Sequence, residues 1–283
     1  MNASTNKSGP LSGLRVLDLT RVLAGPYTTM LLGDLGAEVI KVEQPNTGDE
    51  ARGFGPFQND FSLYFFSVNR GKKSLTLNLK APAGKQIFHR LVSRSDILVE
   101  NFRAGTMKKL GLDYEQLKET YPSLIYAACS GFGQTGPYAT RGAYDMVIQG
   151  MGGILSITGE PDQPPVRVGT SIGDITAALF TTIGILSAVH HRQNTGQGQL
   201  VDVGMLDCQV AILETAGYEI KRLPVLDDID AINERHGLIQ AAEMAIEHAP
   251  WLDAHLQDYR PRTREILLRG RQIDSGKLDS APA

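Results

Sequence analysis

The stretch LRVLDLTRVLAGPYTTMLLGDLGAEVIKVE, residues 14–43, decides the fold, because it places a strand, a helix and a second strand in succession. Residues 14–19 are a short apolar run and residues 38–43 alternate with a period of two, so both are predicted strands. Residues 24–36 are predicted to form a helix with Pro26 in its first turn, where proline is tolerated.

The alternation of strands and helices continues to residue 218. Further strands are predicted at residues 74–79, 96–100, 124–128 and 200–203. Further helices are predicted at residues 83–93, 106–121 with an interruption near Gly111, 144–154, 175–191 and 206–218. This pattern predicts an α/β fold in which helices cover both faces of a parallel sheet. Ligands of such sheets bind beyond the carboxyl ends of the strands, so we expect the loops that leave the strands to carry the functional residues.

The composition of the 283 residues, 42% hydrophobic and 21% charged, is ordinary for a soluble protein and excludes a disordered chain or a disulfide scaffold. A net charge of −3 provides no global basic field, so we expect neither nucleic acid nor a membrane as partner. Cys129 and Cys208 form no C-x-x-C pair, and the six histidines form no H-E-x-x-H motif, so no metal site is predicted. The cysteine usage fits a reducing, cytoplasmic compartment.

The chain changes character near residue 220. Residues 1–220 hold 27 of the 30 glycines, whereas residues 221–283 hold 20 charged residues among 63. We therefore predict a flexible tail over residues 1–10, a large domain over residues 11–220 and a charged helical segment over residues 221–283. The tail lacks the apolar core of a secretory signal. The longest apolar stretch, residues 175–189, is predicted to be too short to span a bilayer and to form a buried helix.

Asp174 is the candidate catalytic residue, because GTSIGD at residues 169–174 leads directly into a predicted helix. Asp174 is expected at or next to the N-cap, and one interpretation is a simple cap. The other is a nucleophile, since the helix dipole would keep the carboxylate ionised and backbone N–H groups could hold an oxyanion. The adjacent Gly173 would let a ligand approach closely. Ser171 lacks a G-x-S-x-G context, which disfavours a serine hydrolase.

Three other segments could bind ligands. GFGQTG at residues 131–136 follows a strand and matches G-x-G-x-x-G, but no apolar helix opens after it, so a flexible loop is the favoured interpretation. NRGKKS at residues 69–74 carries three cations and is either a solvated turn or a site for a phosphate-bearing ligand. ENFR at residues 100–103 stands at the end of a predicted strand, where a binding loop is expected.

These segments together resemble the class III coenzyme A transferases, a family that includes formyl-CoA transferase, the carnitine CoA-transferases and the succinyl-CoA:glutarate CoA-transferases. The resemblance rests on their order along residues 11–218, roughly three quarters of the chain. The matching segments are LDLTRVLAGP at 17–26, GDLGAEVIKVE at 33–43, NRGKKS at 69–74, VENF at 99–102, GFGQTGP at 131–137, GD at 173–174 and TGQGQ at 195–199.

The resemblance implies a Rossmann-like large domain, an interlocked homodimer and Asp174 as the covalent nucleophile. It implies no metal and no permanently bound cofactor, with acyl-CoA and a small carboxylic acid as substrates. The residues implied to contact CoA are Leu23, Ala24, Gln44, Leu77, Asn78, Leu79, Lys80, Asn101, Phe102, Arg103, Lys109, Tyr144 and Asp145. Lys109 stands where the family often has arginine and lacks its bidentate geometry.

Two departures bear on substrate and reaction. Leu23 and Gln44 stand where formyl-CoA transferase has polar or basic groups, which argues against formyl-CoA or oxalate specificity. The related α-methylacyl-CoA racemases have a histidine at the position of Tyr144, and a tyrosine is a poor general base at neutral pH. The sequence of residues 21–26 is most similar to the branch of the family that uses succinyl-CoA and dicarboxylates. Arg52, Arg141 and Arg167 are candidates to hold a distal carboxylate.

The resemblance ends near residue 220, whereas members of the family run to about 400 residues. Residues 221–283 do not resemble the missing part, so they are a divergent ending, the product of a rearranged gene or an interaction segment. A second hypothesis is therefore a catalytically impaired, CoA-binding fragment or subunit. Racemase and nicotinamide-dependent activities are more distant alternatives.

Overall fold

The computed structural model describes residues 9–218 and 229–273. The chain divides into two compact units, Met1–Ile220 and Lys221–Ala283. Most of the predicted tail, residues 1–8, lies outside the described residues, as do residues 221–228 and 274–283 of the predicted charged segment.

The first unit is built on a six-stranded parallel sheet with the strand order β5-β2-β1-β6-β7-β8. Its strands are β1 (Arg15–Asp18), β2 (Glu38–Glu43), β5 (Lys73–Thr76), β6 (Ile97–Glu100), β7 (Ile125–Ser130) and β8 (Leu200–Gly204). Counted within this sheet alone, the order is third, second, first, fourth, fifth, sixth, which is the doubly wound order of the Rossmann fold. The prediction of a Rossmann-like α/β fold is confirmed, and the order reverses between β1 and β6, where ligands of such sheets bind.

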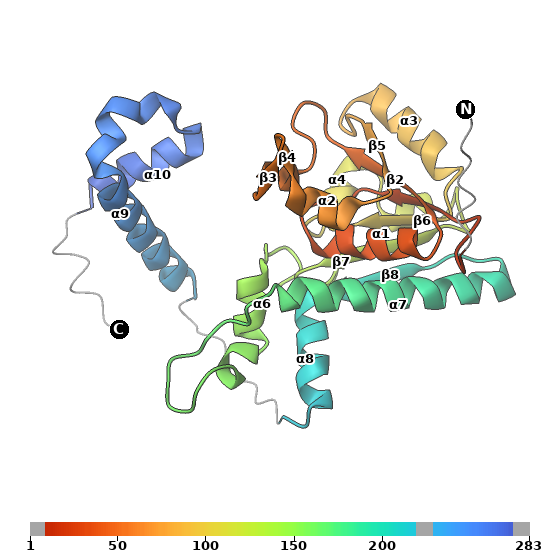
Figure 1. Cartoon of the computed structure of the whole chain (residues 1–283). Coiled ribbons are helices and arrows are strands. Elements are labelled where there is room, and N and C mark those ends of the chain that lie inside the picture. Colours follow the sequence, from red (N-terminus) through yellow and green to blue (C-terminus); the bar gives the residue numbers. More distant parts are fainter. Residues whose placement is uncertain (1–8, 219–228, 274–283) are drawn as a thin grey trace. The chain divides into compact units, whose positions relative to one another are not determined.

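Alternate residues of the strands feed two hydrophobic cores, as buried parallel strands require. Val16 of β1 packs in the core beneath α1 (Ala24–Asp34) and α7 (Ile172–Thr195). Leu17, the next residue, packs in the core on the opposite face, beneath α3 (Pro82–Val92). Figure 1 shows these helices on the two sides of the sheet. A third, smaller core forms under α6 (Asp145–Met151) and α8 (Met205–Thr215).

Several predicted boundaries were wrong for local reasons. Strand β5 ends at Thr76 rather than at Leu79, because residues 77–81 turn: Asn78 Oδ1 accepts the Lys80 N–H at 3.0 Å. The helix predicted over residues 106–121 is two short helices, α4 (Thr106–Leu110) and α5 (Tyr114–Leu117). Gly111 separates them with a φ of 75°, which ends the first helix.

The segment between β2 and β5 holds structure that the sequence pattern did not predict. A 3-10 turn, η1 (Glu50–Gly53), leads into the two-residue strands β3 (Phe57–Gln58) and β4 (Phe61–Ser62) and then into helix α2 (Leu63–Asn69). Ser62 caps this helix by accepting the Phe65 N–H at 3.0 Å. Two-residue strands are too short to show an alternation, and the aromatic residues of α2 favour strands more than helices.

Helix α7 is longer than the predicted 175–191. Its 24 residues have a most apolar window of mean hydropathy 1.7, so by length and composition it could cross a membrane. The predicted apolar stretch, residues 175–189, is only the middle part of this longer helix. Half of that window is buried, and the helix packs against α1, β7 and β8, as the core helix of a domain does.

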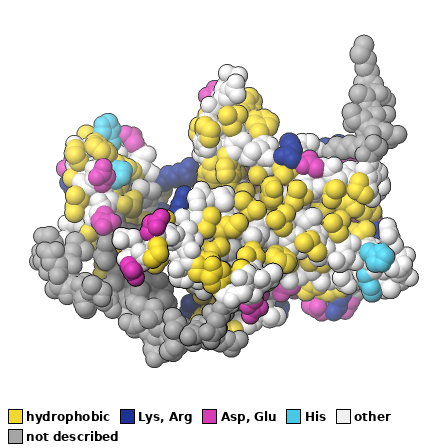
Figure 2. All heavy atoms as spheres, turned by 60° about the horizontal axis from the view of Figure 1, so that its bottom comes forward, with side chains coloured by type: hydrophobic (Ala, Val, Ile, Leu, Met, Phe, Trp, Pro, Cys, Tyr) yellow, Lys and Arg dark blue, Asp and Glu magenta, His cyan; other side chains and the backbone are white. Residues whose placement is uncertain are grey.

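The outer face of α7 remains apolar. Hydrophobic side chains gather over this side of the molecule in Figure 2, and Leu179, Phe180 and Ile183 stay exposed. In the sequence they interleave with buried alanines and threonines of the same helix. Helix α7 therefore has a buried side and an exposed apolar face at Leu179, Phe180 and Ile183.

The second unit is a pair of helices, α9 (Ile229–His255) and α10 (Pro261–Arg271), joined by η3 (Leu256–Asp258). The helices approach closely at Gly270, where a Cβ atom would lie 1.8 Å from the Ala241 carbonyl oxygen. Leu252 and Leu267 are fully buried, and Arg271 pairs with Asp253 at 2.6 Å. A small-residue contact and two leucines thus hold the pair together.

Candidate active site

The loop between β1 and α1 is held in a strained conformation at the carboxyl edge of the sheet. Val22 has a φ of 68°, which a β-branched residue rarely adopts. Its N–H donates to Asp49 Oδ1 at 3.1 Å. The preceding residue is clamped by Asn101, whose amide accepts the Arg21 N–H and donates to the Arg21 carbonyl, both at 2.8 Å. Such strain persists only where neighbours fix the backbone on several sides, and it is concentrated at functional sites.

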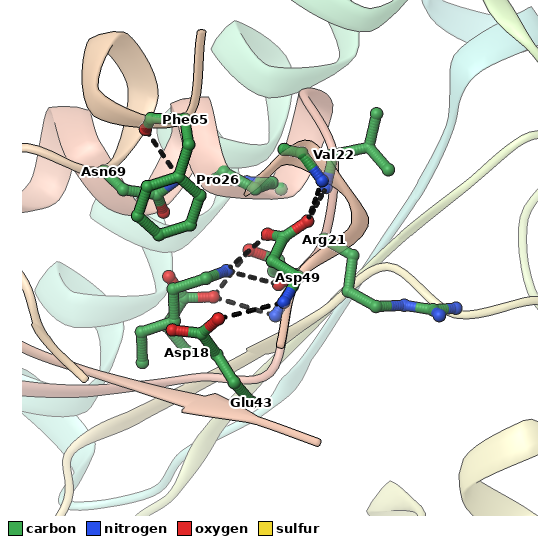
Figure 3. A network of polar contacts seen from close by, with 12 residues as sticks. Asp18, Arg21, Val22, Pro26, Glu43, Asp49, Phe65 and Asn69 are labelled. Atoms are coloured by element: carbon green, nitrogen blue, oxygen red, sulfur yellow. Dashed lines mark hydrogen bonds and ion pairs between the residues drawn. The ribbon is translucent and has the colours of Figure 1, made fainter. Parts of the chain in front are cut away.

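Buried ion pairs support this loop from beneath. Lys41 Nζ lies 2.9 Å from Asp49 Oδ2 and donates to the Thr20 carbonyl oxygen at 2.6 Å. Lys72 Nζ lies 3.0 Å from Asp18 Oδ2 and also donates to the Pro26 carbonyl oxygen at 2.9 Å. The four charged side chains are at most 2% exposed. Figure 3 shows how the network connects β1 and β2 to the turn at Val22.

These pairs correct the interpretation of the cations at residues 69–74. Each has an internal acidic partner: Arg70 pairs with Asp34, Lys72 with Asp18 and Lys73 with Glu38. Lys72 is therefore buried and unavailable to a phosphate, whereas Arg70 and Lys73 form exposed ion pairs at the surface. Burial raises the pKa of Asp18, but the charges of Lys72 and Lys41 and the hydrogen bonds from Thr20 and Thr29 together lower it to about 2.

Asp174 is the third residue of α7, and the N-cap is Ser171, whose side chain caps nothing. The expectation that Asp174 stands at or next to the N-cap was therefore wrong by two to three residues. Capping comes instead from α6, because Asp145 Oδ1 accepts the Gly173 N–H at 2.7 Å. The Asp174 carboxylate is thus free of a capping role.

The electrostatics of Asp174 also differ from the prediction. Burial raises its pKa to about 6, the nearby Asp145 carboxylate raises it as well, and the Ala24 N–H opposes both effects. The helix N-terminus was expected to keep the group ionised, but removal of water from a carboxylate disfavours its charge more strongly. At pH 7 most of the molecules would still carry the carboxylate, poised close to its pKa.

Tyr64 of α2 is a neighbour of Asp174 that the sequence pattern did not indicate. Burial raises the pKa of Tyr64 to about 12, and the charges of Asp174 and Asp49 raise it too. A phenol with so high a pKa keeps its proton at neutral pH. Its position depends on α2, which itself was not predicted, so no signal in the sequence pointed to it.

A groove of about 480 Å³ opens at the carboxyl edge of β1, β2 and β5. The predicted CoA-contacting residues that line it are Gln44, Leu77, Asn78, Leu79, Lys80 and Phe102. Thr20 and Arg21 of the β1–α1 loop line it as well. Since Ala24 of the same region faces Asp174, one short loop connects the groove to the candidate nucleophile.

The other predicted contact residues lie outside the lining of this groove. Leu23 and Ala24 follow the strained turn, and the amide of Asn101 is engaged with the backbone of Arg21. Arg103 is exposed and lies against Gly142, while Lys109 is exposed on α4. Tyr144 is 84% exposed at the start of α6, next to Asp145.

The candidate arginines differ in availability. Arg52 is bound to Glu43 by two hydrogen bonds of 2.7 Å and lies over the Phe65 ring at 3.8 Å, so its guanidinium is committed to the fold. Arg141 lies over the Tyr138 ring at 4.4 Å. Arg167 is exposed, two residues before the glycine that begins the GTSIGD segment.

Two further acidic groups, Glu100 at the end of β6 and Asp202 within β8, hold loops in place. Glu100 is buried, which raises its pKa to about 7, and its Oε2 accepts the Phe102 N–H at 2.7 Å. Asp202 accepts the Gln134 N–H at 2.9 Å and so fixes the GFGQTG loop, which begins no helix. Within residues 9–218 and 229–273, no three histidine, cysteine or acidic side chains gather closely enough to hold a metal ion.

Comparison with known proteins gives a consistent picture over the first unit. The chain is 51% identical to the acetyl-CoA:oxalate CoA-transferase of Acetobacter aceti over 209 residues, covering 74% of this chain and 54% of that protein. It is 49% identical to the succinyl-CoA:mesaconate CoA-transferase of Haloarcula marismortui, covering 75% of this chain and 55% of that protein. The chain thus spans about half the length of these curated relatives.

A solved structure agrees with the sequence matches. The crystal structure of a CAIB/BAIF family protein from Brucella suis superposes with a TM-score of 0.70 at 44% identity, covering 76% of this chain and 60% of that chain. The family described as CoA-transferase family III matches residues 11–227. The doubly wound sheet, the aspartate in the first turn of α7 and these matches lead to one conclusion: the chain belongs to CoA-transferase family III.

Proposed function

We propose that the protein transfers CoA from an acyl-CoA donor to a carboxylic acid, with Asp174 as the covalent nucleophile. The observation that carries this proposal is the setting of Asp174, which is half-buried in the first turn of α7 and faces the Ala24 N–H. Its pKa of about 6 leaves the carboxylate mostly ionised at neutral pH. The membership of family III supports the same chemistry.

The proposed reaction has four steps that conserve the energy of the thioester. Asp174 attacks the carbonyl carbon of the acyl-CoA, which forms a mixed anhydride and expels the CoA thiolate. The thiolate attacks the aspartyl carbonyl, giving an aspartyl-CoA thioester and releasing the donor acid. The acceptor carboxylate then attacks this thioester, and the thiolate finally attacks the acceptor carbonyl of the new anhydride, releasing acyl-CoA and free Asp174.

The chain's own residues are proposed to position the acyl-CoA and to exclude water from the reaction. The groove beside β2 and β5 is proposed to hold the adenosine end of CoA, with Lys80 as a cation at its rim. The β1–α1 loop would then direct the thioester toward Asp174, where the Ala24 N–H can stabilise the developing oxyanion. Burial of Asp174 keeps water from the anhydride, which would otherwise hydrolyse.

We infer a short dicarboxylate as the acid substrate. Oxalate, mesaconate and glutarate occur in the names of the relatives, which act on acids with two carboxyl groups. Arg167 is the candidate for the distal carboxylate, because Arg52 is committed to Glu43. The 51% identity to an acetyl-CoA:oxalate enzyme weakens the earlier argument against oxalate.

We also propose a cytoplasmic homodimer. The exposed Leu179, Phe180 and Ile183 of α7 are an apolar face of the kind that a second subunit covers. Both cysteines are free and buried, as suits a reducing compartment.

The test is intact-mass analysis after incubation with succinyl-CoA and acid quenching. We expect a CoA- or acyl-sized addition on the parent protein and none on Asp174→Asn. The control is Asp162→Asn, which alters an exposed aspartate in the same way and should retain the addition. An addition that persists in Asp174→Asn would refute the assignment of the nucleophile.

A second candidate is a CoA-binding fragment without turnover. It is favoured by one observation, that the chain spans only 54% and 55% of two relatives. Calorimetry with CoA separates the candidates: binding without an adduct supports the fragment, and neither binding nor adduct means that further chain is needed to complete the pocket. Racemisation is disfavoured because Tyr144 replaces the histidine of the racemases.

A further inference from the structure

Gln149 is a fully buried amide on α6, one turn after Asp145. Its Nε2 donates to Asp145 Oδ2 at 2.6 Å and to the Thr170 carbonyl oxygen at 3.3 Å, and its Oε1 accepts the Val168 N–H at 2.9 Å. A flipped amide would set donor against donor and acceptor against acceptor, so only one orientation satisfies all three bonds. Gln149 therefore ties α6 to the segment that precedes α7.

Asp145 carries this constraint to the residue before the candidate nucleophile. While Oδ2 accepts from Gln149, Oδ1 accepts the Gly173 N–H at 2.7 Å. Gly173 leaves little space, because a Cβ atom there would lie 3.0 Å from Asp145 Oδ1 and 3.2 Å from Ile148 Cγ2. The backbone is thus tied at residues 168, 170 and 173 to one turn of α6, and Asp174 follows directly.

We propose that Gln149 is a positioning residue, which holds the Asp145 carboxylate beside Asp174 and thereby sets the place and the charge of Asp174. The functional meaning rests on the proposed role of Asp174 as nucleophile. Gln149 acts through its neighbour, because its amide bonds to Asp145 and the preceding loop. The amide is required: a carboxylate at this position would repel Asp145.

The groups that face Asp174 come from several elements. Asp145 of α6 raises its pKa, and the Ala24 N–H at the start of α1 opposes that effect. Tyr64 of α2 and Cys129 of β7 both feel its charge, and burial keeps their own pKa values high, so both are neutral near pH 6. Asp145 is therefore the neighbouring charge that a change at Gln149 would move.

The test is a carbon-13 NMR titration of the Asp174 carboxyl group in the full chain, assigned with Asp174→Asn. In Gln149→Met, Asp145 Oδ2 loses its partner and only the Gly173 N–H still holds the carboxylate, which can then move away from Asp174, so the Asp174 midpoint should fall by about one pH unit. In Gln149→Glu, a second carboxylate joins Asp145, so the midpoint should rise. A merely structural role would move both variants in the same direction or neither.

The matched control is Gln209→Met. Gln209 is equally buried and also contacts α7, with its Nε2 3.4 Å from Thr176 Oγ1, but it does not bond to Asp145. Since Gln209 Oε1 is buried without a hydrogen-bond partner, Gln209→Met should keep the fold and leave the Asp174 midpoint unchanged. A shift as large as that of Gln149→Met would overturn the proposal.

The titration does not require enzymatic turnover, so failure of the positioning proposal can be distinguished from failure of the proposed function. Opposite shifts without any CoA adduct would uphold the positioning role and refute CoA transfer by this chain. An adduct with unchanged midpoints would do the reverse. If Gln149→Met does not fold, hydrogen exchange of the parent decides, because Val168 and Gly173 N–H groups should exchange far more slowly than that of Gly169. Equal exchange rates would overturn the proposal.

Discussion

The two segments that meet at Asp174 are held in place by different chemistry. The β1–α1 loop rests on buried ion pairs, Lys41 with Asp49 and Lys72 with Asp18. The segment before α7 is held by the neutral amide of Gln149 and by one carboxylate that caps the helix. Loss of one partner from a buried ion pair leaves an unpaired charge, whereas loss of an amide leaves polar groups that can turn or hydrate.

The two kinds of support should therefore affect two different properties, the global stability of the unit and the ionisation of Asp174. The ion pairs lie under the first strands of the sheet, and their removal should affect folding of the whole unit. The Gln149 and Asp145 contacts lie at its edge and should affect the ionisation of Asp174 more than global stability. The following changes test that division, from the largest expected effect to the smallest.

Lys72→Met should destabilise the unit by about 3–5 kcal/mol, because it leaves Asp18 buried without its cation. The neighbouring Lys73→Met is the matched control. Lys73 is 73% exposed and pairs with Glu38 at the surface, so its loss should change stability by less than about 1 kcal/mol. Urea unfolding measures both, and equal losses would contradict the importance of the buried network.

Asp174→Asn should stabilise the protein at neutral pH while abolishing the adduct. The pKa of Asp174 is raised from 3.8 to about 6 on folding, so the folded state binds more protons between these values and loses relative stability as the pH rises. Removing the charge should therefore add about 1–3 kcal/mol above pH 6. The gain should vanish below pH 4, where both states are protonated.

Unfolding of the parent and of Asp174→Asn at pH 4 and pH 8 checks this expectation. A gain of equal size at both values would mean that the effect is unrelated to ionisation. A loss at pH 8 would mean that the carboxylate is stabilised in the fold, contrary to its raised pKa.

Val22→Gly should relieve backbone strain and raise stability by about 1 kcal/mol, while slowing adduct formation because the loop that presents Ala24 becomes less rigid. Asn46→Gly is the control, since Asn46 has a φ of 71° but belongs to a residue type that tolerates this region. It should leave both stability and adduct formation nearly unchanged. A slower reaction in the control would contradict a specific role for Val22.

Periodicity was sufficient where the elements are long and their burial is regular. The strands at residues 38–43 and 96–100 and the helix at residues 24–36 were predicted within two residues, because each carries several apolar positions with one period. It failed at residues 50–69, where strands of two residues and an aromatic helix provide no period. Tyr64 was missed with them.

The candidate site, too, was predicted only in part. Asp174 was predicted from its place before a helix and from the resemblance, and Gln44, Leu77 and Phe102 do line one groove. The raised pKa of Asp174 could not be predicted, because it depends on burial and on Asp145, which lies 29 residues earlier in the chain. The buried pairing of Lys72 was missed for the same reason, since its partner Asp18 lies on β1, far away in the sequence.

By itself the sequence determined the alternating α/β architecture and the family, and it pointed to Asp174 as the candidate nucleophile. These follow from local periodicity and from ordered motifs, which need no knowledge of distant contacts. Only the tertiary structure decided which charges are buried in pairs, how Asp145 rather than Asp174 caps α7, and which way Gln149 points. Such properties depend on the distance and the solvent exposure of groups that are remote in the chain, and those quantities exist only once the chain has folded.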